Sequence, residues 1–85
     1  MGKATMKREP TLDLHGYRTD EVYDALEAFL RKHETAPRVR VMPGKGEGKV
    51  KAQVIDYLSK ARYPWSYEKT PNGAVNEGVL IVHME

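Results

Sequence analysis

The stretch "LDLHGYRTDE", Leu12–Glu21, joins a strand pattern to a helix pattern through a glycine. Leu12 and Leu14 alternate with Asp13 and His15, and residues two apart on a strand point to the same side. The leucines are therefore expected to face a core while Asp13 and His15 share the opposite face. An acid beside an imidazole, where a strand ends at a glycine, is typical either of a catalytic pair or of an ordinary solvated surface.

Apolar spacing along the rest of the chain predicts two helices and three further strands. Thr19 is expected to cap the first helix, whose three-to-four spacing of apolar residues fades at His33 and Glu34. The second helix is expected over Lys49–Arg62 because Pro64 ends the pattern. Residues 70–78 are expected to form a turn-rich connection. The further strands are expected over Arg38–Met42, Trp65–Lys69 and Val79–Met84.

The order β-α-β-α-β-β predicts an α/β two-layer sandwich with a four-stranded mixed sheet. The first three strands would be parallel and joined by right-handed crossovers, while the fourth would return antiparallel. Strand alternation places both helices on one face of the sheet and leaves polar groups on the other. Residues 1–9 are expected to be a flexible basic tail and residues 10–85 a single domain.

Composition excludes several classes of protein. The chain of 85 residues is 40% hydrophobic and 31% charged, which is typical of a soluble globular domain. It has no cysteine, so disulfides and thiolate chemistry are excluded, and a cytoplasmic location is expected. No apolar run is long enough to span a bilayer, and the first ten residues lack the apolar core of a signal peptide. No membrane partner is therefore expected.

Positive charge gathers in one segment although the net charge is only +2. Residues 38–51 contain five basic residues and one acidic residue. Such a basic segment is the usual footprint of a polyanionic partner, and its alternative is a solvated basic surface.

The glycine loop "PGKGEGK" lies within this basic segment. Because the carboxyl ends of parallel strands meet at one edge, this loop and the "HGYRT" loop after the first strand are expected to converge. Gly44, Gly46 and Gly48 would let backbone N–H groups approach an anion closely. Lys49 and Lys51 open the expected helix, where the helix dipole disfavours a cation by about 0.3–1 kcal/mol each, so their grouping with Lys45 around the loop favours a phosphate ligand. The loop matches neither a Walker A nor a dinucleotide fingerprint, so a flexible tight connection is the alternative.

His15 is the candidate general acid or base, and Asp13 is the candidate residue that orients it. One Asp and one His do not make a two-metal site, so no metal ligands are assigned. No small-molecule cofactor is expected. Tyr17, beside the glycine, is the best candidate for stacking on a base, while Arg18 and Arg40 are candidates for contacts to a nucleic-acid backbone.

Two motifs together resemble a known family. "LDLHG" (Leu12–Gly16) and "VRVMPGKGEG" (Val39–Gly48), each followed by a helix, are similar to the Smr, or small MutS-related, domain. The resemblance covers residues 10–85. It implies a fold similar to the C-terminal domain of translation initiation factor three, and nicking or structure-directed endonuclease activity on DNA or RNA. It also implies catalytic roles for Asp13 and His15, and nucleic-acid contact by Gly44, Lys45, Gly46 and Gly48.

The sequence departs from the family at two loop positions. Family members often carry a His or Thr just before the first loop glycine, where this chain has Pro43, which cannot donate a proton. Glu47 stands where a small residue is common. Three functions therefore stay open: an endonuclease that uses Mg²⁺ or Mn²⁺ if DNA is cut, a non-catalytic nucleic-acid-binding module, and a domain that binds an acidic protein.

Overall fold

The chain folds in the order strand, helix, strand, helix, strand, strand, as the sequence predicts. The structure is a computed structural model that describes residues 9–44 and 48–84. The expectations for Lys45, Gly46 and Glu47, and for residues 1–8, lie outside the described residues. The elements are β1 (Thr11–Asp13), α1 (Thr19–Lys32), β2 (Arg38–Met42), α2 (Lys49–Lys60), β3 (Trp65–Lys69) and β4 (Val75–His83).

The four strands form one mixed sheet in the order β1-β2-β4-β3. β1 pairs with β2 in parallel, with Asp13 opposite Met42. β4 is antiparallel to both β2 and β3, so β3 runs in the same direction as the first two strands. The predicted strand directions are therefore confirmed. The last strand is inserted between β2 and β3.

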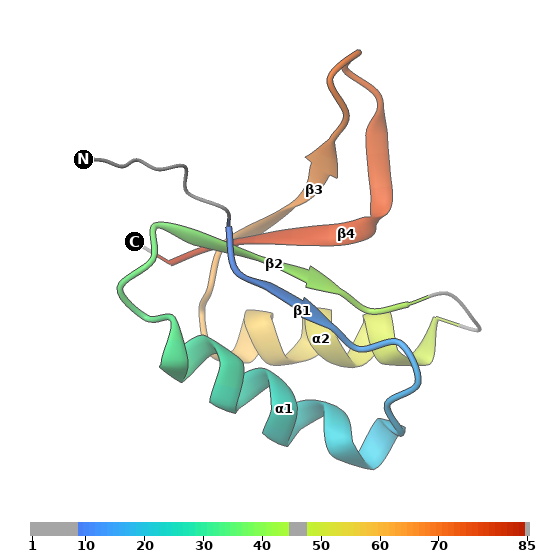
Figure 1. Cartoon of the computed structure of the whole chain (residues 1–85). Coiled ribbons are helices and arrows are strands. Elements are labelled where there is room, and N and C mark those ends of the chain that lie inside the picture. The colour runs from blue at the N-terminus through green and yellow to red at the C-terminus, as the bar shows by residue number, and fades with distance from the viewer. Residues whose placement is uncertain (1–8, 45–47, 85) are drawn as a thin grey trace.

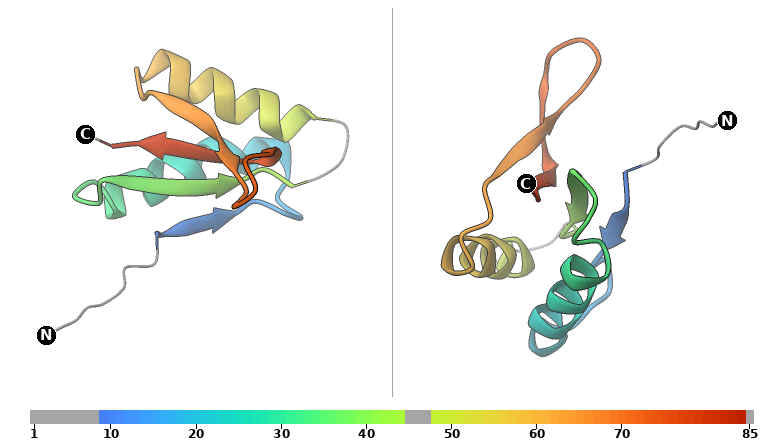
Figure 2. Two further views of the ribbon diagram at one scale, coloured as in Figure 1. Left: turned by 90° about the horizontal axis from the view of Figure 1, so that it is seen from above. Right: turned by 90° about the vertical axis from the view of Figure 1, so that its left-hand side faces the viewer.

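Both helices cover one face of the sheet, which confirms the two-layer sandwich (Figures 1 and 2). This arrangement follows from the alternation of buried and exposed side chains along each strand. In β2, Val39 and Val41 are fully buried, whereas Arg38 is exposed. Each fully buried side chain of this size contributes about 1.5–3 kcal/mol relative to an exposed one. The other core residues are Leu14, Val22, Leu26, Leu30, Val54, Leu58, Leu80 and Val82. Within the described residues no helix is both long and apolar enough to cross a bilayer.

The structure corrects three predicted boundaries. β4 begins at Val75 rather than Val79, and its hairpin with β3 rises on the side opposite the helices (Figure 1). A bulge beside Tyr67 breaks the alternation that would have revealed the longer strand. α2 ends at Lys60, because Arg62 adopts a φ of 65°, outside the helical region. α1 has Arg18 as its N-cap: its backbone N–H donates to the Glu21 carboxylate at 3.0 Å.

A polar contact joins the two helices on the surface away from the sheet. The Tyr23 hydroxyl of α1 donates to the Asp56 carboxylate of α2 at 2.8 Å, and Lys60 lies 3.2 Å from the same carboxylate. The Tyr23 ring also packs against Tyr57, with 5.9 Å between centroids. The hydrogen bond from Tyr23 lowers the pKa of Asp56, and the same bond raises the pKa of Tyr23.

This hydrogen bond predicts a pH-dependent stability. Because the folded-state pKa of Asp56 is lowered, its contribution is present above the ordinary value of 3.8 and is lost as the pH falls through the folded-state value. Tyr23→Phe should therefore lower the denaturation midpoint at pH 7 and have little effect near pH 2. Urea unfolding of both proteins across this pH range measures the difference. A difference in denaturation midpoint that stays constant down to pH 2 would contradict this assignment. So would an equally large difference when Tyr23→Phe is introduced into the Asp56→Asn variant.

Candidate functional site

The two loops that follow β1 and β2 meet at one edge of the sheet, as predicted. The Leu14 N–H continues the ladder beyond β1 by donating to the Met42 carbonyl at 2.8 Å. Gly44, which comes two residues after Met42, has a φ of 89°. A Cβ placed on it would lie 3.4 Å from the Cα of His15. The backbone of the second loop therefore packs directly on the backbone of the first at His15.

His15 is exposed on a tight turn. The Asp13 carboxylate accepts a hydrogen bond from the backbone N–H of His15 at 2.9 Å, and Tyr17 N–H donates to the Leu14 carbonyl at 3.0 Å. Gly16 completes the turn with a φ of 84°, a conformation that L side chains rarely adopt. The sequence led us to expect the carboxylate beside the imidazole ring. In the structure Asp13 holds the peptide that presents the ring.

A pocket of about 490 Å³ lies between the two loops. Leu14 and Tyr17 from the first loop face Pro43 and Gly44 from the second, and Val50 of α2 lines the pocket as well. Pro43 itself is buried. The residue that departs from the family pattern therefore helps to form an apolar wall. The remaining lining residues are Asp13, His15, Gly16 and Met42.

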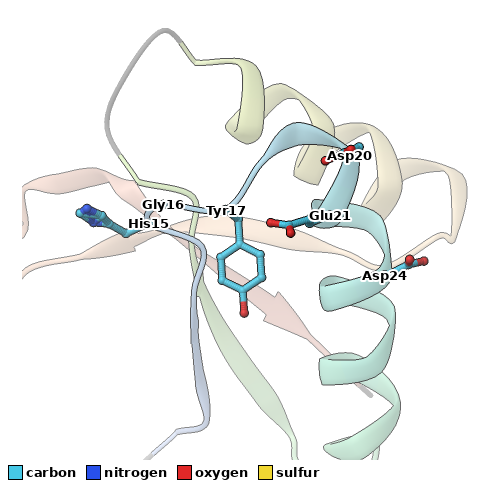
Figure 3. A pocket seen from close by; sticks show the side chains of 6 residues that line it. All are labelled: His15, Gly16, Tyr17, Asp20, Glu21 and Asp24. Carbon is cyan, nitrogen blue, oxygen red and sulfur yellow. The ribbon is translucent and has the colours of Figure 1, made fainter.

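A second hollow, on the α1 side of the same turn, is acidic. It has a volume of about 550 Å³ and shares three residues of the turn, His15, Gly16 and Tyr17, with the first pocket; the others are Asp20, Glu21 and Asp24. Figure 3 shows these three carboxylates along α1, with the His15 ring pointing away from them. Three nearby carboxylates repel an anion, so a phosphate is disfavoured on this side. Among the residues that the structure describes, no group of three His, Asp or Glu could hold a metal ion.

The start of α2 has the opposite electrostatic character. Gly48, with a φ of 84°, is its N-cap, Lys49 is its first residue, and its first turn holds no acidic side chain. In α1, by contrast, Asp20 and Glu21 occupy the first turn. Unsatisfied N–H groups and the helix dipole make a helix N-terminus attractive to anions, and only α1 neutralises that attraction with its own carboxylates.

The predicted basic residues do not all lie at this edge. Arg18 is at the start of α1, where its side chain is exposed and lies 3.4 Å from Asp20. Arg40 lies on the sheet face opposite the helices, with its guanidinium 2.9 Å from Glu68 of β3. Asn76 donates to the same Glu68 carboxylate at 3.2 Å. The arginine that the sequence grouped with the loops therefore joins β2 to the β3–β4 hairpin.

Sequence reasoning missed the apolar wall of the pocket. Met42, Pro43 and Val50 flank the glycine loop and line the pocket, and Val50 also packs against the core. Lys51 was grouped with the phosphate-binding lysines, but it lies 4.7 Å from the centroid of the Tyr67 ring and 3.9 Å from Glu77. Its cation packs α2 against the hairpin.

Comparisons with known proteins agree with this geometry. The chain matches the Smr domain over residues 12–85. It is 31% identical over 77 residues to Endonuclease MutS2 of Levilactobacillus brevis, and 34% identical over 76 residues to Endonuclease MutS2 of Bacillus mycoides. These alignments cover 88% and 87% of this chain but 10% of each relative, so the chain spans about a tenth of their length.

A solved structure has the same fold. The crystal structure of the human small-MutS related domain superposes with a TM-score of 0.68 and 32% sequence identity. The match covers 86% of this chain and 97% of the human domain. With a family match over nearly the whole chain and a solved relative of the same architecture, this chain belongs to the Smr domain family.

Proposed function

We propose that this domain processes nucleic acid as an endonuclease that nicks DNA or cleaves RNA. One observation carries the proposal: the exposed His15 imidazole stands where the loops after β1 and β2 pack on each other. Asp13 and Gly44 hold the backbone of His15 from two sides. The name Endonuclease MutS2, carried by relatives that this chain matches over a tenth of their length, supports the same activity.

His15 moves the proton in the proposed reaction. It takes a proton from the attacking oxygen or gives one to the leaving oxygen, which are the tasks of a general base and a general acid. Asp13 is a positioning residue, because its carboxylate holds the backbone N–H of His15. The phosphate is held on the α2 side, where the helix begins with Lys49 and its N-terminal N–H groups and carries no acidic residue in its first turn. Lys45, Gly46 and Gly48 belong to the same proposed phosphate site.

The attacking group depends on the nucleic acid. In RNA the neighbouring 2′-hydroxyl can attack the phosphorus, and His15 then accepts its proton. In DNA a water molecule must attack, and Mg²⁺ or Mn²⁺ would assist it by lowering the pKa of that water. The described residues form no cluster that would cage such an ion, so no step is assigned to a metal here.

The two arginines contact the phosphate backbone of the nucleic acid in this proposal and take no part in the proton transfer. Arg18 stands beside the turn, and because both it and its partner Asp20 are exposed, at 77% and 68%, it can leave that weak ion pair to reach a flanking phosphate. Arg40 is 29% exposed and would first have to leave Glu68. We therefore assign Arg18 the larger contribution to affinity and Arg40 the smaller one.

A second candidate function is binding without cleavage. Pro43 favours it, because a buried proline occupies the position just before Gly44 and offers no proton donor to the leaving oxygen. In this case the loops and Lys49 bind a phosphate while His15 serves as a contact. The two functions differ in what the loss of the imidazole does.

Replacing the imidazole separates the two functions. His15→Ala should lower the cleavage rate about 100- to 10,000-fold, the usual contribution of a general acid or base, while nucleic-acid affinity changes little. Supercoiled plasmid, a branched DNA and a structured RNA, each with EDTA, Mg²⁺ or Mn²⁺, provide the assay. His33→Ala is the matched control, because His33 packs on Phe29 at the far end of α1. If the wild-type protein binds these substrates but cleaves none of them, the endonuclease proposal is excluded and the function is binding without cleavage.

The packing of Gly44 on His15 can be tested with a matched pair of glycines. Gly44→Ala should cost about 1–2 kcal/mol of stability, because its φ is positive, and should also lower activity by displacing His15. Gly73→Ala carries the same strain at a φ of 91° in the β3–β4 turn, with no atom within 4 Å of the new Cβ. Thermal unfolding and cleavage rates are measured for both. Equal activity in the two variants would show that the loop contact does not position His15.

A further inference from the structure

Tyr17 is the large exposed side chain at the site. In the described residues the exposed large hydrophobic side chains are Tyr17, Tyr23 and Val75, and Tyr17 alone of these lines the pocket between the loops. It is 40% exposed. Its hydroxyl makes no hydrogen bond to any residue that the structure describes, whereas the Tyr23 hydroxyl donates to Asp56. An exposed aromatic ring therefore stands on the same turn as His15, and the two side chains leave that turn in different directions (Figure 3).

The pocket walls have the character of a base-binding site rather than of a phosphate site. The half-buried side chains of Met42 and Val50 supply apolar surface, and a phosphate placed against it would lose hydration without gaining donors. A nucleobase has flat faces that bury favourably against such surface and stack on an aromatic ring. The volume of about 490 Å³ is ample for one base.

The charged residues on the two sides of Tyr17 define the path that a nucleic-acid strand would take across the site. The hollow on the other side of Tyr17 is lined by Asp20, Glu21 and Asp24, which repel phosphates. The start of α2, beside Val50, has Lys49 and no acidic residue in its first turn. A strand whose backbone follows the α2 side therefore directs a base toward Tyr17 and away from the acidic hollow.

We infer that this pocket takes one unpaired nucleobase next to the phosphate at His15, with Tyr17 stacking on the base. The inference rests on the proposed function and narrows its substrate to nucleic acid that carries an unpaired nucleotide at the cleavage position. A paired base cannot enter, because its edge is hydrogen-bonded to its partner and both its faces are stacked. Bulges, loops, flaps and single strands meet this requirement, in DNA or in RNA.

The test uses oligonucleotides in which fluorescent 2-aminopurine occupies successive positions, paired in one set and bulged in the other, in DNA and RNA versions. Wild type should quench the bulged fluorophore at one position and should leave the paired set unchanged. Tyr17→Ala should abolish the quenching and lower the cleavage rate of the bulged substrate about 5- to 100-fold, the range of a lost base–aromatic stack. Tyr17→Phe should retain both. On a substrate with an abasic site at that position, Tyr17→Ala should lower the cleavage rate no further.

Tyr23→Ala is the matched control, because Tyr23 is 43% exposed, on the helical surface outside both hollows. Equal losses in Tyr17→Ala and Tyr23→Ala would overturn the inference. The inference would also be overturned if His15→Ala abolished cleavage while the cleavage rate was the same for paired and bulged substrates and for wild type and Tyr17→Ala. That outcome would leave the proposed function intact. Quenching that needs Tyr17 without any cleavage would support the base pocket and overturn the nuclease assignment.

Discussion

The parallel pairing of β1 with β2 is the contact on which the site depends. Its register sets Asp13 opposite Met42, so the two strands finish level with each other. The chain then leaves each strand at the same height, and the Leu14 N–H adds one more rung by donating to Met42. A shift of two residues would move Gly44 away from the His15 backbone. The proposed chemistry therefore rests on a strand of three residues that pairs with β2 at the edge of the sheet.

Local periodicity was enough to predict most of the fold, because each layer buries side chains in a simple repeat. Leu12 and Leu14 alternate with polar residues, and the apolar residues of both helices recur at helical spacing. The convergence of the two loops followed from strand direction. The start of β4 could not be predicted, since Asn76 and Gly78 are poor strand formers that a bulge and the Glu68 side chain accommodate.

Contacts between distant residues were beyond the sequence for the same reason. Nothing near Arg40 in the chain indicates that it pairs with Glu68, which is 28 positions away and on a strand that β2 does not touch. The contact of Asp13 with a backbone N–H, instead of with the imidazole, depends on the turn at Gly16. The convergence of the loops that carry the candidate residues was thus predictable. Their geometric roles depend on turns and on the sheet order.

The central position of β4 has a consequence for biosynthesis. β2 and β3 do not pair with each other but both pair with the strand Val75–His83, which follows every other element of the domain in sequence. While a ribosome is still adding these residues, the earlier strands and both helices lack the strand that contributes Leu80 and Val82 to the core. Because these pairings join residues far apart in the sequence, we expect the sheet to be completed late in folding. Nascent chains stalled before residue 75 would therefore expose the apolar faces of α1 and α2 to chaperones.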